Sequence, residues 1–549
     1  MKILLVAINA KYIHSNLAVY SLASSAKGLD VEIKIGEYTI NNNKDDILAA
    51  IYEEKADVVA FSCYIWNIEY VNCIGQELKK IAPNISVWVG GPEVSYNYTE
   101  VLEKKKYVDI VVIGEGEATF AQLINVYKNQ NTERVEGLAK VSGIAYRENL
   151  QIEGRLVVNN SNCNYMDMDD LPFVYDQIEN FENKIIYYET SRGCPFNCSY
   201  CLSSIDKRVR FRSLVKVYEE LQFFLANKGP QIKFIDRTFN CSKEHSRKIW
   251  TYILEHDNGI TNFHFEVSSD LFEEEDFAIF RQMRQGLIQL EIGLQSTNLE
   301  AIREVHRVMN IDKLKNALAK IKEMNNIHQH LDLIAGLPYE DYESFKQSFN
   351  NAYDMKPDQL QLGFLKVLKG SYMYENRHEY ELVYHDYSPY EVMATKWIDY
   401  DEILKLKNVE EVLEVYYNSN QFKCSLAYLL TVFSKPYDFY FELSSYYEEN
   451  NLFGLQQKRV VRYDILRKYA REKLTNKIDF KLLDEMLIID LYMRENMKTR
   501  PEWGVNLDDY KEAFNEFFKN GGNKQLQLKK DGEDYQSKIV ARQMHIERV

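Results

Sequence analysis

The chain has 549 residues, of which 46% are hydrophobic, and it carries a formal net charge of −15. This length predicts two to four domains, and the acidic charge argues against a broadly nucleic-acid-binding surface without excluding a local basic groove. The eight cysteines are mostly isolated, and the apolar first residues form too short a run for a signal segment or a membrane span, so we expect a cytoplasmic protein without a disulfide framework.

Residues 1–130 alternate between apolar segments typical of strands and amphipathic segments typical of helices. Strands are predicted over residues 2–8, 31–38, 58–64, 86–89 and 109–113. Helices are predicted between them, over residues 15–27, 45–55, 67–81 and 99–106. Continuous apolar strands between amphipathic helices predict a parallel sheet covered on both faces, and hence an α/β domain of the Rossmann type.

The carboxyl ends of four of these strands carry specialised residues. Ligands bind at this edge of such sheets, and each tip has either glycine, which lets the backbone approach a ligand, or an aromatic side chain with an amide. The candidate binding residues are Asn9, Tyr12, Ser62, Tyr64, Trp66, Asn67, Gly90, Gly91, Pro92, Glu93, Gly114, Gly116 and Glu117. Four such tips on one edge favour a large flat ligand over ordinary turn glycines.

A small irregular connector is predicted over residues 131–183. It contains a hairpin, with strands over 143–146 and 155–158, and a polar loop over 166–175. Strand–helix alternation then resumes over residues 184–370, with strands predicted over 185–190, 231–236, 263–267, 287–293, 330–334 and 359–364. These six repeats predict a second α/β domain.

Three cysteines, Cys194, Cys198 and Cys201, fall within eight residues. Three thiolates on one short loop can hold a polynuclear iron–sulfur cluster and leave one iron without a protein ligand, where chemistry can begin. The alternative is a zinc site, which wants a fourth cysteine or histidine, commonly in a second close pair. The next candidates, Cys241 and His245, lie some forty residues further on and form no such pair.

The spacing C-x3-C-x2-C, with Tyr200 directly before the last cysteine, resembles the radical S-adenosylmethionine (SAM) superfamily. The resemblance implies a 4Fe–4S cluster whose open iron is chelated by SAM. It also implies cleavage of SAM to a 5′-deoxyadenosyl radical by an electron from the cluster. An external reductant such as flavodoxin or ferredoxin is then expected.

Residues 184–370 resemble the partial (β/α)6 barrel of this superfamily, which implies site residues at the strand ends. Asp236 corresponds to the place that holds the SAM amino group, Glu266 to a ribose contact, and Arg307 to a partner of the SAM carboxylate. Further candidates are Gln295, Ser296 and Leu365 at these ends, and Tyr200 in the cysteine motif. For each residue alone, a salt bridge or a surface role is as plausible as a ligand contact.

The tips of the first domain resemble the cobalamin-binding domain that precedes the barrel in one branch of the superfamily. Gly90-Gly91 and the turn from Ser62 to Tyr64 carry this likeness. The Asp-x-His-x-x-Gly loop of domains that ligate cobalt from below is absent, so His14 is not expected to be a ligand. The resemblance makes Tyr64 and Trp66 the candidates to cover the lower face of cobalamin.

A second iron–sulfur cluster in the first domain, as in methylthiotransferases, is the alternative to cobalamin. Only Cys63 and Cys73 lie within residues 1–130, and with Cys163 they would make three. Two ligands are too few for a cluster.

Residues 371–549 predict a mostly helical domain. Helices are predicted over residues 389–403, 409–417, 425–433, 438–450, 458–475 and 481–495, with a terminal hairpin around an Asp-Gly turn within 525–548. No chemical motif is visible there, and a cap over the barrel mouth is one hypothesis for its role.

The resemblance predicts a cobalamin-dependent radical SAM enzyme, most simply a methyltransferase acting on an unactivated carbon. The alternatives are a rearrangement, cyclisation or sulfur insertion, with or without cobalamin and including reactions on a modified tRNA base. A cobalamin-binding sensor or scaffold is the alternative from another class. The substrate stays open among small molecules, lipids, peptides and RNA, and a monomer is expected.

Overall fold

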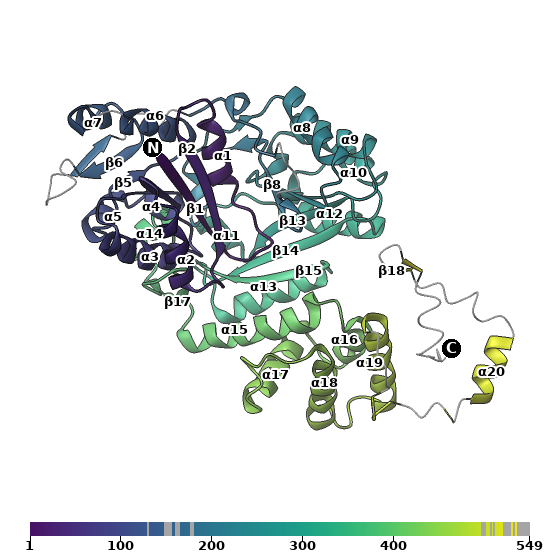
Figure 1. Cartoon of the computed structure of the whole chain (residues 1–549). Coiled ribbons are helices and arrows are strands. Elements are labelled where there is room, and N and C mark those ends of the chain that lie inside the picture. The colour runs from purple at the N-terminus through teal and green to yellow at the C-terminus, as the bar shows by residue number, and fades with distance from the viewer. Residues whose placement is uncertain are drawn as a thin grey trace. The chain divides into compact units, whose positions relative to one another are not determined.

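A computed structural model describes residues 1–128, 131–147, 156–159, 165–175, 181–495, 501–504, 508, 511–519, 529–530 and 533–534. The chain forms two compact units (Figure 1). The first contains Met1–Pro357 and Leu362–Ile403, and the second contains Asp358–Gln361 and Leu404–Val549.

The first sheet has seven strands in the order β2-β1-β3-β4-β5-β6-β7. They are β1 (Lys2–Asn9), β2 (Glu32–Thr39), β3 (Val58–Ser62), β4 (Ser86–Gly90), β5 (Ile110–Val112), β6 (Ile144–Arg147) and β7 (Leu156–Asn159). The first five pair in parallel, and β6 and β7 add an antiparallel hairpin. The strand order changes direction at β1, so the tips of β1 and β3 flank the point where such sheets bind ligands.

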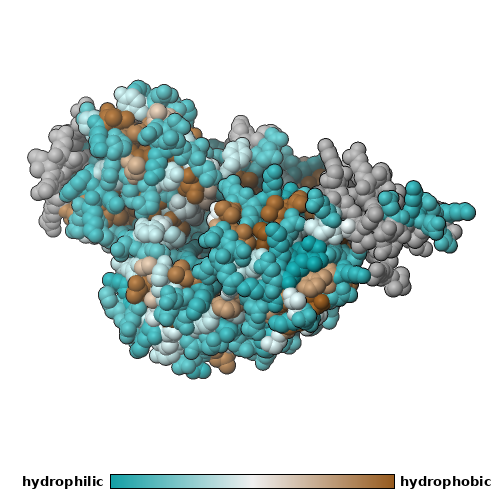
Figure 2. Space-filling model, turned by 90° about the horizontal axis from the view of Figure 1, so that it is seen from below, coloured by the Kyte–Doolittle hydropathy of each residue, from teal (hydrophilic) through white to brown (hydrophobic). Residues whose placement is uncertain are grey.

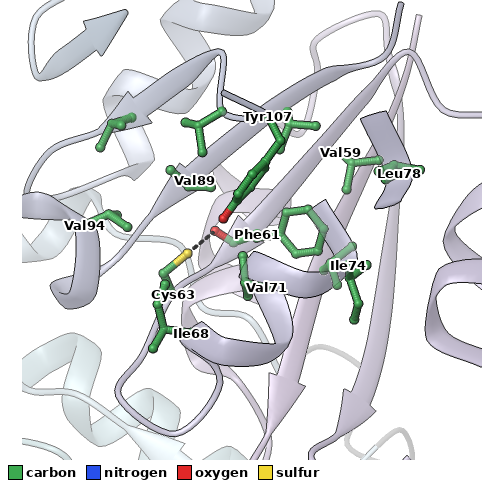
Figure 3. Packing of buried hydrophobic residues seen from close by; sticks show 14 of the residues in the cluster. Val59, Phe61, Cys63, Ile68, Val71, Ile74, Leu78, Val89, Val94 and Tyr107 are labelled. Atoms are coloured by element: carbon green, nitrogen blue, oxygen red, sulfur yellow. Dashed lines mark hydrogen bonds between the residues drawn. The ribbon is translucent and has the colours of Figure 1, made fainter. Parts of the chain in front are cut away.

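Helices cover both faces of this sheet because alternate residues of each strand enter two separate cores. One core joins β1 and β3 to α2 (Lys44–Glu53) and α3 (Ile68–Ile81), and Figure 3 shows Phe61 and Cys63 packed there against Val71 and Ile74. The other core contains residues of α1 (Leu17–Ser25) and α6 (Glu117–Tyr127). The remaining helices of this region are α4 (Pro92–Ser95), α5 (Tyr98–Lys104) and α7 (Asn131–Leu138).

The second sheet has six strands in the order β15-β14-β13-β12-β11-β8. They are β8 (Ile186–Tyr188), β11 (Gln231–Phe234), β12 (Asn262–Val267), β13 (Ile288–Gln295), β14 (His328–Ala335) and β15 (Gln359–Phe364). Because β8 and β15 are its two edges, the sheet is an open, partial barrel. Its helices are α8 (Leu214–Ala226), α9 (Lys243–Glu255), α10 (Glu274–Phe280), α11 (Leu299–Glu304), α12 (Ile311–Met324) and α13 (Tyr342–Asp354).

Two segments follow the barrel within the first unit. They are the short helix α14 (Tyr372–Glu375) and the antiparallel pair β16 (Val383–Tyr384) and β17 (Val392–Ala394). The helix predicted over residues 389–403 is therefore wrong in its first part, since α15 (Tyr400–Leu413) begins only at Tyr400. The backbone of Val392 pairs with Leu365 at the end of the barrel sheet, which holds this segment extended.

The second unit is helical and has a core rich in tyrosine. Its helices after α15 are α16 (Lys423–Leu429), α17 (Pro436–Glu449), α18 (Arg459–Lys473), α19 (Phe480–Arg494) and α20 (Lys511–Lys519). Buried tyrosine hydroxyls find partners there, as Tyr416 and Tyr447 do at 2.7 Å. The predicted terminal hairpin appears as β18 (Lys529–Lys530) and β19 (Glu533–Asp534), while its Asp-Gly turn and the rest of the tail lie outside the described residues.

The predicted fold class is confirmed, with a Rossmann-type sheet, a partial barrel and a mostly helical last part. The five predicted strands of residues 1–130 are all present, with their ends shifted by one or two residues. Within the described part of the chain, no helix is both long and apolar enough to cross a membrane. On the face drawn in Figure 2, hydrophobic residues gather in small groups among hydrophilic ones.

Candidate active site

The three cysteines lie on a loop closed by a two-stranded ribbon, β9 (Ser191–Arg192) with β10 (Arg210–Phe211). The loop starts with Gly193, whose φ is +92° and where a Cβ would lie 2.4 Å from the Arg208 carbonyl oxygen, so only glycine fits. Cys194 and Cys198 are each 8% exposed, and all three cysteines are free. The Cys194 amide donates to the Asp206 carbonyl, and the Cys201 amide donates to the Cys198 carbonyl, both at 3.1 Å.

Within the described residues, no three His, Cys, Asp or Glu side chains stand close enough together to hold one metal. Zinc needs each sulfur at about 2.3 Å. A cluster of several irons binds each cysteine at a different iron, and therefore tolerates wider spacing.

An open pocket of about 590 Å³ lies beside Cys198. It brings together four residues that the sequence predicted: Cys198, Glu266, Gln295 and Arg307. The other lining residues are Phe196, Arg237, Thr238, Val267, Ser268, Glu291, Gly293, Val308 and Asp332.

Arg307 and Gln295 are arranged around Gly293. Arg307 donates to the Gly293 carbonyl and, at 3.7 Å, to Cys198 Sγ. A Cβ at Gly293 would lie 2.3 Å from Gln295 Nε2, and Gln295 itself has a φ of +70°. Two buried atoms beside Gly293 have no hydrogen-bond partner among the described residues: Arg307 Nε and Gln295 Oε1. Such atoms are costly unless a ligand satisfies them, so the pocket fits a polar ligand at the cysteine loop.

Other predicted barrel residues do not line this pocket. The Asp236 carboxylate accepts hydrogen bonds from Thr190 Oγ1 at 2.7 Å and from Ser191 Oγ at 2.5 Å, and burial raises the pKa of Asp236. Ser296 Oγ donates to Glu340 at 2.6 Å. The Leu365 side chain is buried. These three residues support strand ends instead of facing the pocket.

The tip of β3 presents two stacked aromatic rings at the edge of the first sheet. The rings of Tyr64 and Trp66 have centroids 4.4 Å apart and are inclined by 7°. Trp66 Nε1 and Asn67 Nδ2 both donate to the Ile8 carbonyl, at 3.1 and 3.0 Å. Trp66 is 42% exposed, so its ring offers a flat apolar surface backed by Tyr64.

The other predicted tip residues have varied surroundings. Gly91 has a φ of +116°, and a Cβ there would lie 2.5 Å from the Cys63 carbonyl oxygen, which makes the turn between Gly90 and Pro92 a tight one. Glu93 accepts a hydrogen bond from Tyr390 at 2.8 Å, and burial raises its pKa. The remaining predicted residues lie at the tips of β1, β3 and β5 and are Asn9, Tyr12, Ser62, Gly114, Gly116 and Glu117.

Contacts within this edge occupy several of those side chains. Asn9 Nδ2 donates to the His14 carbonyl at 3.0 Å, and Ser62 Oγ accepts from Asn16 at the same distance. Glu117 is ion-paired with Arg192, and Tyr12 is exposed.

His14 is engaged by the barrel. Its Nδ1 lies 2.7 Å from the hydroxyl of Tyr187 on β8, and Ile185 donates its amide to the Ile13 carbonyl at 2.7 Å. The loop after β1 therefore joins the first sheet to the start of the barrel.

Three family models match successive parts of the chain. A B12 binding domain matches residues 3–124, the radical SAM superfamily matches residues 188–352, and a protein of unknown function, DUF4080, matches residues 378–549. The chain therefore carries a B12 binding domain followed by a radical SAM domain. Its cofactors are accordingly a 4Fe–4S cluster, SAM and cobalamin, as the sequence predicted.

Relatives and solved structures agree with this assignment. The radical SAM chain is 24% identical over 376 residues to an uncharacterized methyltransferase of Pyrococcus horikoshii, covering 66% of this chain and 77% of the relative. It is 24% identical over 354 residues to the anaerobic magnesium-protoporphyrin IX monomethyl ester cyclase of Rubrivivax gelatinosus, covering 61% and 60%. The fold is similar to that of the cobalamin-dependent SAM radical enzyme OxsB, with a TM-score of 0.60 and 14% identity over 98% of this chain and 83% of that chain.

Several ionisable side chains of the barrel strands line the pocket or lie next to it. Glu291 accepts a hydrogen bond from Lys233 at 2.9 Å, and its carboxylate lies 3.0 Å from His264 Nε2. Burial alone would raise the pKa of Glu291, but these two partners outweigh it and lower the pKa to about 2. Burial and the Glu291 charge raise the pKa of Glu266 to about 7.

The sequence prediction missed Glu291, Asp332 and Arg237. A signal for the first two was present, because their strands alternate apolar and polar residues, as in the Ile288–Gln295 strand. A strand with one polar face lines a lumen or a surface, whereas the inner strands β1, β3 and β4 of the first sheet are mostly apolar.

Proposed function

We propose that this radical SAM enzyme methylates an unactivated carbon, with cobalamin as the methyl carrier. The observation that carries the proposal is that Tyr64, at the β3 tip, lies within electrostatic reach of Arg237, a residue of the pocket beside the cysteine loop. Burial raises the pKa of Tyr64, and the charge of Arg237, a pocket residue, opposes this rise. A substrate between them would meet both cofactors at once.

The residues have separate tasks in this proposal. The cluster would be held by Cys194, Cys198 and Cys201. The buried polar atoms of Arg307 and Gln295 that lack a partner would form hydrogen bonds with SAM. Together the cofactors supply a deoxyadenosyl radical that removes a hydrogen atom and a methyl group that replaces it. The protein orients the groups and excludes water, since a buried site suits a radical that must not meet solvent.

The stacked pair of Tyr64 and Trp66 would lie against the corrin ring. Its exposed, flat surface supports this role, and the hydrogen bond from Trp66 to the Ile8 carbonyl fixes the ring plane. Glycine at position 91 would let the backbone approach the cofactor closely.

Labelled SAM tests the proposal. Anaerobically reconstituted holoenzyme would be incubated with trideuteromethyl SAM, a one-electron donor such as flavodoxin or ferredoxin, and separate small-molecule, lipid, peptide and RNA fractions of a cell extract. We expect deoxyadenosine together with a product that has gained the intact labelled methyl group. Deoxyadenosine formation with a new product that lacks the label would reject methylation.

Ring closure is the second candidate, and the cyclase among the relatives favours it. It predicts a product that has lost hydrogen and gained no label in the same experiment. A sensor or scaffold role predicts no deoxyadenosine at all.

A further inference from the structure

The cysteine loop is tied to the cobalamin-binding edge by a buried arginine. Arg192 directly precedes Gly193, and its side chain is only 15% exposed. Its guanidinium donates to both carboxylate oxygens of Glu117, at 2.6 and 3.3 Å, and to Glu189 at 2.9 Å. Glu117 is the first residue of α6 and follows the tip of β5 in the first sheet.

A second arginine reinforces the same junction. Arg210 lies opposite Arg192 in the ribbon of β9 and β10 and forms an ion pair with Glu115. It also donates to the Met166 carbonyl at 2.8 Å, and Arg192 itself lies 3.4 Å from Glu115. Both strands that close the cysteine loop therefore hold one tip of the cobalamin-binding domain.

The contact made by Arg192 differs from the other contacts between the two sheets in its position along the chain. It is two residues from Cys194, so their Cα atoms are separated by at most about 7.6 Å. The contact between His14 and Tyr187, in contrast, joins the first sheet to β8 ahead of the cysteine loop. A two-pronged arginine–carboxylate pair also restricts direction as well as distance.

We propose that Arg192 is a positioning residue that sets the placement of the iron–sulfur cluster relative to cobalamin. Because Arg192 is paired with Glu117, the position of the β5 tip constrains the position of the loop that carries Cys194. The inference goes beyond the proposed function, because it holds whether the reaction is a methylation or a ring closure. Placement matters in either case, since a displacement of about 1 Å can slow a reaction about a hundredfold.

The test measures the distance between the two cofactors and needs no substrate. Holoenzyme would be prepared with cob(II)alamin and a reduced cluster, and the dipolar coupling between their spins would be recorded by pulsed EPR. The variants are Arg192→Ala, Arg192→Lys and Glu117→Gln. Arg284→Ala is the matched control, because Arg284 makes a similar two-pronged pair with Asp257, at 2.7 and 3.1 Å, and takes no part in this junction.

We expect one narrow distance distribution for the wild type and for the control, and an intermediate one for Arg192→Lys, because an ammonium group keeps the charge but cannot form the two-pronged pair. Arg192→Ala should broaden or shift the distribution by about 1 Å or more at unchanged iron and corrinoid content, and Glu117→Gln should do so less. Unchanged distributions in both Arg192→Ala and Glu117→Gln would overturn the proposal. If Arg192→Ala loses a cofactor, the outcome rests on Glu117→Gln alone. A broadened distribution in Glu117→Gln supports the proposal, and an unchanged distribution refutes it.

Discussion

The two sheets of the first unit are both largely parallel, yet their strands are buried in different ways. All five residues of β3 in the first sheet are buried, whereas β13 in the second alternates buried and partly exposed residues along its whole length. The first sheet has helices on both faces, so a ligand can reach it only at the strand tips. The second has helices outside and polar side chains inside, so it can bind a ligand within its lumen as well.

The two sheets therefore offer two different kinds of binding surface. The edge of the first sheet offers a flat aromatic pair and tight glycine turns, which suit a large planar cofactor. The barrel offers carboxylates, arginines and unsatisfied amides, which suit a polar ligand beside the cluster. Four changes test how separate the two surfaces are.

The largest effect is expected from Cys198→Ala. Loss of this thiolate should remove the cluster and reduce deoxyadenosine formation to the level of cluster-free protein, while the first sheet still binds corrinoid. Iron and sulfide analysis, the visible spectrum and deoxyadenosine release measure these three properties.

Cys241→Ala is the control for that variant, because Cys241 lies within electrostatic reach of Cys194 but outside the triad. It should keep both the cluster and SAM cleavage. Continued deoxyadenosine release by Cys198→Ala would show that the triad is wrongly assigned.

Gly91→Ala tests the converse case, because it should disturb the first sheet and leave the cluster in the barrel. The added Cβ would meet the Cys63 carbonyl oxygen at 2.5 Å with φ at +116°, so we expect a destabilisation of roughly 1–3 kcal/mol and loss of corrinoid, with the cluster retained. Gly28→Ala is the control, since Gly28 also has a positive φ, of +89°, but has no atom within 4 Å of the added Cβ. Thermal unfolding and the corrinoid-to-iron ratio measure the outcome. Equal effects of the two substitutions would remove the steric explanation.

Glu266→Gln tests the barrel lumen through its pH dependence. The folded protein holds the Glu266 proton up to a pKa of about 7, whereas the ordinary value is 4.5. Between pH 4.5 and pH 7, Glu266 is therefore protonated in the folded protein and ionised in the unfolded chain. Because the folded state binds the extra proton, the free energy of unfolding falls as the pH rises through this range. The variant should lose this decline and gain roughly 1–3 kcal/mol relative to the wild type between pH 5 and pH 8.

Urea unfolding at a series of pH values measures that difference. Glu219→Gln on the exposed face of α8 is the control and should follow the wild type at every pH. A Glu266→Gln curve parallel to that of the wild type would contradict the assigned pKa.

The smallest effect is expected from His14→Ala. The variant loses the contact with Tyr187, which is worth about 1 kcal/mol, and should leave the cob(II)alamin EPR spectrum unchanged. Disappearance of a nitrogen splitting from that spectrum would instead identify His14 as a cobalt ligand and merge the two surfaces into one site.

Local patterns in the sequence determined much of this protein. The spacing of Cys194, Cys198 and Cys201 predicted the cofactor chemistry because all three ligands belong to one loop. The periodicity of the strands predicted two α/β domains, since burial on one or both faces shapes the residues of each strand. The stretch after the barrel was less predictable, because the strand β17 depends on backbone pairing of Val392 with Leu365 at the end of the barrel sheet.

Only the tertiary structure decided which polar side chains at the strand tips face a ligand. Glu117, Glu93 and Ser296 looked alike as candidates, yet their partners Arg192, Tyr390 and Glu340 lie 75, 297 and 44 residues away. An ion pair or a buried hydrogen bond forms wherever packing brings its two groups together. The sequence alone does not show which distant groups will meet.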